Sequence, residues 1–307
     1  MTSKLYRIKF PIIRPPVEAY SILIGVTEGC WWNNCRFCGV YKNWNVDPPQ
    51  DIQPYQVRPI EEVLKELEIL REYYGEFKNT IFLGGGSTMS APTDYLVTIL
   101  NKIKELWPNM TRISSYAKNL DILRKSEEDL KRLHEAGLTI CYMGLESGSR
   151  NILRMMKKGT TPENMIKAAK KLMSSGIKIS VYIVLGLGGV ELSEEHAIET
   201  AKVLNQMNPN IFRFRTLNLI PTAPLYKDWQ EGKFNVVQPW GITKELLTIF
   251  ENLSDDITSY VFNDHVSNYE TFECQLPDEK EEVIKYLKMR LKDPGLKLAR
   301  HYNRVSM

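Results

Sequence analysis

Three cysteines that crowd into nine residues are the strongest chemical signal in this chain of 307 residues. Cys30, Cys35 and Cys38 are separated by four and then two residues, so one short loop can bring three thiols around a metal centre. Soft thiolates favour iron–sulfur clusters or zinc. A closed site needs four protein ligands, and every histidine is remote from the loop: His134, His196, His265 and His301. Three ligands leave one metal position open, which is what a reactive iron cluster needs.

Two other interpretations fit the same spacing. A zinc loop could be completed by a remote ligand such as Cys141, Cys274 or a histidine. Alternatively, the three thiols could be unrelated buried side chains. The spacing by itself leaves all three interpretations open, so the rest of the sequence has to decide between them.

Further candidate residues follow apolar runs. Glycines in such positions allow a backbone to approach a ligand closely, and one run consists of Gly84, Gly85, Gly86 and Ser87. A second glycine run begins at Gly186. It is not a phosphate-binding loop, because the basic residue and the Ser or Thr of that motif do not follow it.

The elements that must position these residues are strands that alternate with helices. Apolar, β-branched runs predict strands at residues 21–26, 80–83, 112–116, 139–145, 177–185 and 212–219. Helical spacing and capping residues predict helices between them, with Pro59 at the start of one, Ser126 and Gly137 around another, Thr161 and Gly176 around a third, and Ser193 as the cap of the last.

Alternation of this kind predicts parallel βαβ units, which bind ligands at the carboxyl ends of their strands. It does not by itself separate an open sheet from a barrel. From about Leu225 the pattern gives way to Pro, Trp and Gly, followed by helical stretches at residues 243–253 and 279–291. These residues are expected to extend the core, not to form a second one.

Composition gives no reason to expect a nucleic-acid or membrane partner. The 40 Lys and Arg nearly balance the 37 Asp and Glu, leaving a net charge of +3. No apolar run approaches the ~20 residues that span a bilayer, and Met1–Phe10 lacks the apolar core of a signal peptide. The odd number of cysteines fits metal binding better than disulfides, so a reducing, cytoplasmic location is expected.

The cysteine loop resembles that of the radical S-adenosylmethionine (radical SAM) superfamily, in which an aromatic residue precedes the last cysteine as Phe37 precedes Cys38. The common family spacing is three and then two residues, whereas this chain has four and then two. The run that starts at Gly84 stands where the family has a Gly-Gly-Glu segment that receives the methionine amino group. Gly86 replaces the acid, so only backbone recognition is expected there.

Three further segments carry the resemblance. The residues around Glu146 are similar to the ribose-binding segment of coproporphyrinogen oxidase and methylthiotransferase relatives, with Lys158 where a basic residue meets the cosubstrate carboxylate. Gly186 stands at the family's adenine contact. Leu219 and Pro221 belong to a stretch that resembles its sixth-strand motif.

This resemblance implies an α/β fold, a partial (β/α)6 TIM-like barrel over residues 1–225, with a mainly helical extension over 226–307 that covers it. It also implies a [4Fe-4S] cluster on the three cysteines, which reductively cleaves S-adenosylmethionine to a 5′-deoxyadenosyl radical. That radical takes hydrogen from an unidentified substrate, and a reducing electron donor is required. Two alternatives are a zinc-binding interaction protein and a methylthio- or sulfur-inserting enzyme. The second would need another cluster, for which only Cys141 and Cys274 remain.

The last predicted strand bears two arginines on one face, because side chains alternate along a strand. We expect Arg213 and Arg215 to point into the barrel and bind a carboxylate or phosphate of the substrate, with Tyr182 lining the same space. An ion pair with helix acids such as Glu194 or Glu199 is an equally weighted alternative, since buried guanidiniums need a partner.

Overall fold

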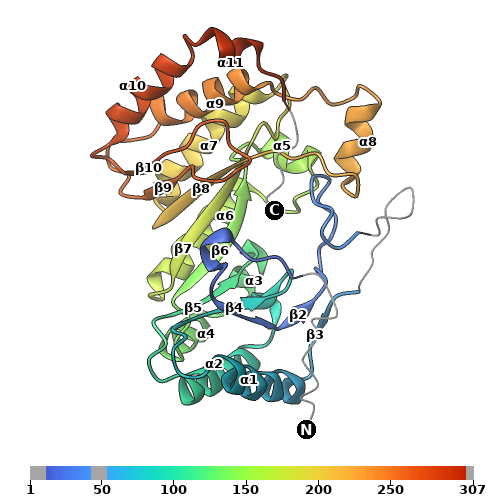
Figure 1. Cartoon of the computed structure of the whole chain (residues 1–307), viewed down its shortest axis with the longest axis vertical. Coiled ribbons are helices and arrows are strands. Elements are labelled where there is room, and N and C mark those ends of the chain that lie inside the picture. Colours follow the sequence, from blue (N-terminus) through green and yellow to red (C-terminus); the bar gives the residue numbers. More distant parts are fainter. Residues whose placement is uncertain (1–11, 43–53, 302–307) are drawn as a thin grey trace.

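A computed structural model describes residues 12–42 and 54–301 of the chain. The segment Met1–Phe10, for which the sequence predicts no signal peptide, lies outside these residues. An eight-stranded sheet forms the centre of the molecule, and helices cover one of its faces (Figure 1).

Six strands of this sheet are the predicted ones, and they lie side by side in chain order with parallel pairing. The two outermost strands of the sheet do not pair with each other, so the barrel is open. These findings confirm the α/β partial barrel. The bounds of the six strands are β1 (Ile22–Gly25), β4 (Thr80–Gly84), β5 (Arg112–Tyr116), β6 (Ile140–Glu146), β7 (Lys178–Leu185) and β8 (Ile211–Thr216).

Helices connect the strands, and most begin where the caps predict. Ser126 forms a capping box with Asp129, and Thr161 accepts a hydrogen bond from the Asn164 amide. The prediction for Ser193 is wrong by one residue, because Leu192 is the cap and Ser193 begins the helix. The helices of this part are α1 (Ile60–Tyr74), α2 (Thr93–Leu106), α3 (Asn119–Arg124), α4 (Glu127–Glu135), α5 (Arg150–Met155), α6 (Pro162–Ser174) and α7 (Ser193–Met207).

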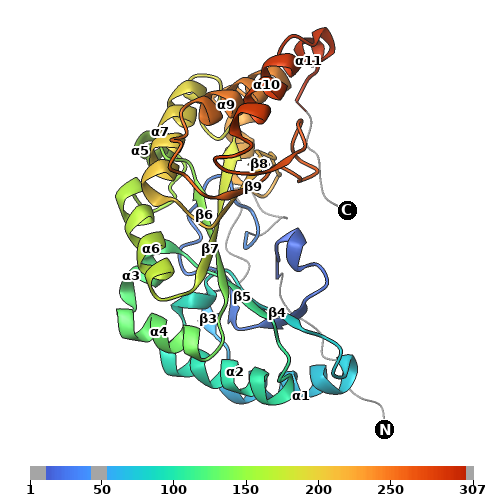
Figure 2. The same ribbon diagram turned by 90° about the vertical axis from the view of Figure 1, so that its left-hand side faces the viewer.

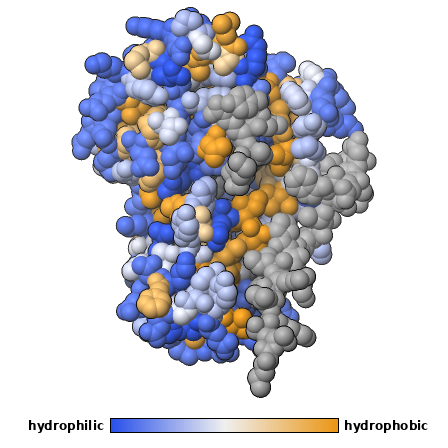
Figure 3. All heavy atoms as spheres, viewed as in Figure 1, coloured by the Kyte–Doolittle hydropathy of each residue, from blue (hydrophilic) through white to orange (hydrophobic). Residues whose placement is uncertain are grey.

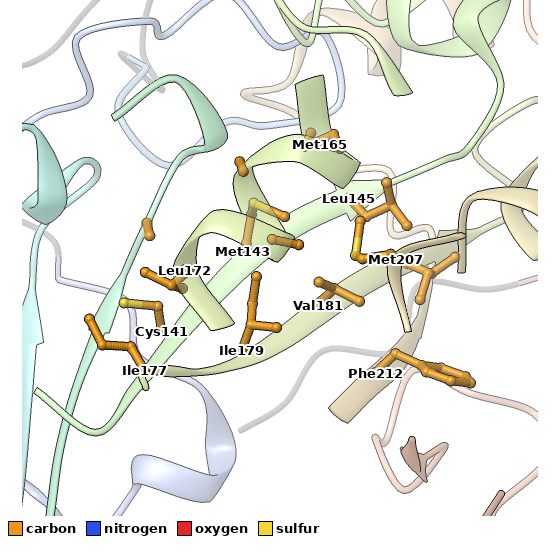
Figure 4. Packing of buried hydrophobic residues seen from close by; sticks show 14 of the residues in the cluster. Cys141, Met143, Leu145, Met165, Leu172, Ile177, Ile179, Val181, Met207 and Phe212 are labelled. Atoms are coloured by element: carbon orange, nitrogen blue, oxygen red, sulfur yellow. The ribbon is translucent and has the colours of Figure 1, made fainter. Parts of the chain in front are cut away.

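The two faces of the sheet differ in character. Alternate residues such as Cys141, Met143 and Val181 point to the helices, where they pack with Met165 and Leu172 of α6 in the main hydrophobic core (Figure 4). The residues between them point to the opposite, inner face, which Figure 2 shows on the side away from the helices. The inner face therefore belongs to the space that a barrel encloses.

The residues after 225 add both helices and strands to this architecture. Strand β9 (Tyr260–Phe262) pairs in parallel with β8, and β10 (Glu273–Gln275) pairs antiparallel with β9. Phe250 of α9 (Pro239–Glu251) contacts Phe214 on the outer face, so this helix continues the helical layer. The other helices are α8 (Pro224–Gln230), α10 (Lys280–Arg290) and α11 (Pro294–Leu298). This part thus widens the sheet and shares its core.

Short elements flank the strands of the sheet. They are the 3-10 helices η1 (Pro16–Glu18) and η2 (Thr88–Ser90) and the small ribbon of β2 (Thr27–Glu28) with β3 (Gln56–Val57). Helix η1 comes before β1, whereas β2 and η2 follow the carboxyl ends of β1 and β4. Within residues 12–42 and 54–301, no helix is long and apolar enough to cross a membrane. Hydrophobic residues gather in the middle of the face shown in Figure 3, whereas both ends of the molecule are mainly hydrophilic.

Candidate active site

The cysteine loop lies at the carboxyl end of β1, and as whole residues its three cysteines are partly exposed. The loop is anchored to α5 by the Arg36 amide, which donates to the Met156 carbonyl at 3.0 Å. The Arg36 side chain forms an ion pair with Asp228 of α8. These contacts hold the loop from two sides, so the positions of the cysteines do not depend on the loop alone.

The predicted glycine run packs directly against this loop. The Gly86 amide donates to the Gly29 carbonyl at 3.1 Å, and Ser87 Oγ lies 3.7 Å from Cys30 Sγ. A Cβ atom on Gly86 would lie 2.4 Å from the Gly29 oxygen and 2.8 Å from Cys30 Cβ. The absence of the family's acid at this position therefore has a steric reason, since no side chain fits between the two segments.

The electrostatic surroundings of the thiols are mixed. Burial raises the pKa of the Cys38 thiol to about 11 and also raises the pKa of Cys35. The cations Lys158 and Lys118 act in the opposite direction on Cys35. A bound iron centre would provide the positive charge that thiolates in such a buried place require.

Glu146 and Lys158 come together beside the loop. Lys158 Nζ lies 2.5 Å from Glu146 Oε1 and 5.9 Å from the centre of the Phe37 ring. Glu146 has a left-handed backbone with φ +63°, which is strained for a residue with a side chain. The predicted ribose-binding acid, the predicted carboxylate-binding lysine and the aromatic residue of the cysteine loop are thus adjacent.

The remaining predicted cofactor residues lie at the same edge of the sheet but are less closely grouped. Leu219 is buried in a small hydrophobic cluster with Leu187 and Ile152, against which Phe37 packs. Gly186 has φ +78° at the end of β7, and Pro221 is exposed. The described contacts join Leu219 to the cysteine loop, whereas Gly186 contacts the extension.

Sequence reasoning missed a buried polar network behind this edge. Ser147 Oγ lies 2.7 Å from His196 Nδ1, and His196 Nε2 lies 3.5 Å from Glu245 Oε1. Glu245 also accepts hydrogen bonds from the Gly186 amide at 2.7 Å and from Ser193 at 2.5 Å. The network links the turn after Glu146 to the turn at Gly186. No local pattern signals it, because its members are far apart in the chain.

Two tryptophans of the cysteine loop were also missed. Trp31 Nε1 donates to Asp121 at 2.9 Å, and Trp32 Nε1 donates to the Lys157 carbonyl at 2.7 Å. Lys118 Nζ lies 4.6 Å from the centre of the Trp31 ring. Their position between the first two cysteines is the signal that could have marked them as part of the site.

The structure places both arginines of β8 on the inner face. Arg213 stacks on the Phe262 ring, Arg215 lies 5.0 Å from the centre of the Tyr182 ring, and neither forms an ion pair with Glu194 or Glu199. Phe214, between the two arginines, packs on the helical side instead. The described contacts therefore do not support the alternative that helix acids neutralise these arginines.

The donor set on this loop fits an iron–sulfur cluster, because three thiolates are the kind of ligand that such clusters take. Among residues 12–42 and 54–301, no three His, Cys, Asp or Glu side chains gather closely enough to hold one metal ion. Cys141 and Cys274 are buried in the main core, so they offer no ligands for a second cluster.

Comparison with known proteins agrees with this geometry. A family model described as the radical SAM superfamily matches residues 24–201, more than half of the chain. The tRNA uridine(34) acetyltransferase of Methanocaldococcus infernus is 26% identical over 110 residues, covering 36% of this chain and 21% of that protein. Heme chaperone HemW of Bacillus subtilis is 25% identical over 189 residues, covering 59% and 49%. The chain thus spans half or less of the length of these relatives.

Solved structures share the fold. Coproporphyrinogen III oxidase (HemN) from Escherichia coli, described as a radical SAM enzyme, aligns with a TM-score of 0.52 at 15% identity, over 75% of this chain and 50% of that one. The archaeal Elp3 of Methanocaldococcus infernus aligns with a TM-score of 0.50 at 17% identity, over 88% and 63%. At these identities the likeness concerns the fold alone.

Proposed function

The chain belongs to the radical SAM superfamily, whose members are enzymes, and on this premise we propose that it cleaves S-adenosylmethionine reductively with a [4Fe-4S] cluster. Cys30, Cys35 and Cys38 hold the cluster. The observation that carries the proposal is the close grouping of the cysteine loop, the glycine run and the pair of Glu146 and Lys158 at one edge of a parallel sheet.

The side chains around the loop bind the cosubstrate. Glu146 accepts hydrogen bonds from the ribose hydroxyls, and Lys158 binds the methionine carboxylate. The ion pair between them orients both side chains toward the cosubstrate. The backbone of residues 84–87 receives the amino group. Gly186 contacts the adenine, Leu219 and Pro221 contribute to cosubstrate binding, and the apolar cluster beside Phe37 limits the access of water.

When bound and reduced, the cluster supplies one electron that splits S-adenosylmethionine into methionine and a 5′-deoxyadenosyl radical, which takes a hydrogen atom from the substrate. The contribution of the chain is positioning, because a reactive carbon must be held against the hydrogen that it abstracts. A reducing electron donor is the required partner. Ser87 Oγ, 3.7 Å from Cys30 Sγ, would donate a hydrogen bond to that thiolate when it holds the cluster.

Cysteine variants test the cluster. After anaerobic reconstitution the protein should show broad visible absorption with about four irons and four sulfides per chain. With dithionite and S-adenosylmethionine, the wild type should form 5′-deoxyadenosine, and Cys30→Ala, Cys35→Ala and Cys38→Ala should form none. Cys141→Ala is the matched control, since this thiol is buried in the core, and it should retain activity. Full cleavage after the loss of one loop cysteine would reject the proposal.

A second experiment addresses the substrate. The protein is incubated with S-adenosylmethionine, dithionite and an extract of cells grown in deuterated medium. Deuterium should then appear in 5′-deoxyadenosine, detected by mass spectrometry. Fractionation of the extract then follows that deuterium to the molecule that supplied it. No transfer from any fraction, with cleavage intact, would contradict hydrogen abstraction from a small substrate.

A further inference from the structure

Two arginines on the inner face of β8 lack the partners that buried cations need. Arg213 is 4% exposed, its guanidinium lies 3.8 Å from the centre of the Phe262 ring, and its Nε has no hydrogen-bond acceptor among the described residues. Arg215 donates to the Phe214 carbonyl, and its one carboxylate partner in the described part of the chain is Asp264, at 3.9 Å. Burial of guanidinium groups without anions is strongly unfavourable, so a bound anion would stabilise these two arginines.

A third donor lies beside them. Tyr182 of β7 stands directly opposite Arg213 in the ladder between the two strands. Its hydroxyl is buried and has no hydrogen-bond partner in residues 12–42 and 54–301. Burial lowers the pKa of His265 to about 4, and Arg215 acts in the same direction, so this imidazole is neutral near pH 7. Among the described residues, Asp264 acts on both Arg215 and Tyr182, and Glu18, which acts on Tyr182, is already paired with Arg112. The two arginines therefore outnumber the one carboxylate beside them in the described part of the chain.

Aromatic rings continue the site across the inner face. Phe82, Tyr116, Tyr142 and Tyr182 come from four successive strands, with neighbouring ring centres 5.0, 6.4 and 6.3 Å apart. Phe82 and Tyr142 are buried, and the Tyr142 hydroxyl donates a hydrogen bond to Glu18 of η1 at 2.5 Å. Tyr116 and Tyr182 are only partly covered. A ligand therefore meets an aromatic wall next to the three donors.

We infer that the substrate is a small molecule that carries an oxyanion, either a carboxylate or a phosphate, next to a flat apolar group. The oxyanion binds Arg213, Arg215 and Tyr182, and the apolar group packs against Tyr116 and Tyr182. This inference rests on the proposed function, because it names the molecule on which the radical acts.

The place of the donors also limits the length of the molecule. Tyr182 of β7 and Arg213 of β8, which stand opposite each other in the sheet, each lie about three residues before the carboxyl end of their strand. A strand rises about 3.3 Å per residue. The oxyanion and the carbon that gives up hydrogen at that edge are therefore separated by roughly 10 Å. A bare oxyanion without such an extension is too short to be the substrate.

Binding of model anions tests this inference without any reductant or cosubstrate. Benzoate, phenyl phosphate and inorganic phosphate are titrated into the reconstituted protein at constant ionic strength, and affinity is measured by calorimetry and thermal shift. Benzamide is the uncharged control for benzoate. Benzoate or phenyl phosphate should bind more tightly than inorganic phosphate, and benzamide should not bind. The better of the two aromatic probes identifies the oxyanion as a carboxylate or a phosphate.

Variants assign the binding to the inner face. Arg213→Gln and Arg215→Gln should each lower the affinity for the tighter-binding aromatic anion by tenfold or more, because each removes a charged hydrogen-bond donor. Arg132→Gln on α4, where the side chain is 41% exposed and pairs with Asp94, is the matched control and should bind like the wild type. Unchanged affinity in both inner-face variants, or equal binding of benzamide and benzoate, would overturn the inference.

A stability measurement separates a binding arginine from a structural one. Without any probe, Arg213→Met should melt at or above the temperature of the wild type, because it removes a buried charge that lacks a partner. A lower melting temperature together with retained anion binding would contradict the inference. Failure of the wild type to cleave S-adenosylmethionine would refute the proposed function instead, and it would leave the anion measurements as they stand.

Discussion

Replacing Glu245 by Gln should change how the stability of the protein depends on pH. Glu245 lies on α9 and is 2% exposed, and burial raises its pKa from 4.5 to about 7. Its carboxylate accepts hydrogen bonds from the Gly186 amide and from Ser193. Glutamine keeps an oxygen for the Gly186 amide but does not titrate, so the substitution removes the ionisation and preserves the shape.

The sign and size of this pH dependence follow from the pKa of Glu245 in the unfolded chain, 4.5, and in the folded chain, about 7. The folded chain holds the Glu245 proton more tightly than the unfolded chain, so protonation favours folding. That stabilisation is fully present below pH 4.5 and is lost as the pH rises through about 7. One pKa unit corresponds to about 1.4 kcal/mol, so between pH 4.5 and 8 the free energy of unfolding of the wild type should fall by about 3 kcal/mol relative to that of Glu245→Gln. Burial lowers the pKa of His196 to about 4, which has the opposite effect at lower pH, but His196 is present in both proteins.

Urea unfolding at pH 4.5, 6, 7 and 8 gives the free energies of unfolding. The matched control is Glu251→Gln, at the exposed end of the same helix, where the carboxylate pairs with Lys288 at 2.8 Å. The difference between this control and the wild type should stay nearly constant with pH. If the difference for Glu245→Gln is also flat, Glu245 does not have a raised pKa and the argument from burial fails.

Four further substitutions have defined outcomes. Glu146→Ala and Lys158→Ala should each weaken S-adenosylmethionine binding about ten to a hundredfold in calorimetry, since each loses a charged hydrogen bond of roughly 1.5 to 3 kcal/mol; unchanged binding would reject either role. Gly86→Ala should lower the iron content after reconstitution, because its Cβ would meet the Gly29 oxygen at 2.4 Å, and full iron loading would contradict this packing. Ser126→Ala should cost about 1 kcal/mol of unfolding free energy through loss of the α4 cap, and an effect near zero in urea unfolding would show that the cap is not needed.

Much of the fold could be predicted because its signals are local. The core strands are long enough to show an apolar pattern, and the bounds predicted for β5 agree with the structure at both ends. The cysteine loop stood out through its spacing, whereas Glu146 and Lys158 were predicted from their resemblance to family motifs. The fold brings these segments to one edge, because the carboxyl ends of parallel strands meet there. In contrast, β9 and β10 have three residues each, which is too short for a period, and only pairing with their neighbours defines them.

The rest of the site depends on contacts that no local pattern encodes. Ser193 illustrates this: its hydroxyl is typical of a helix cap, but in the fold it donates to Glu245, a residue 52 positions later. The same carboxylate holds Gly186, and His196 connects it to Ser147. Each of these side chains has an ordinary structural role when considered alone. Their common position behind two predicted cofactor segments appears only once the chain is folded.

These contacts also bear on how the two parts of the chain depend on each other. A core that ended at residue 225 would lose Glu245, and the buried Gly186 amide would then lack its acceptor. It would also expose the edge of β8, to which β9 is paired, together with Phe214, which packs on Phe250. Arg213 would lose the Phe262 ring on which it stacks. The extension is therefore needed for the turn at Gly186 and for the inner face beside β8, so activity and anion binding should both require the part of the chain after residue 225.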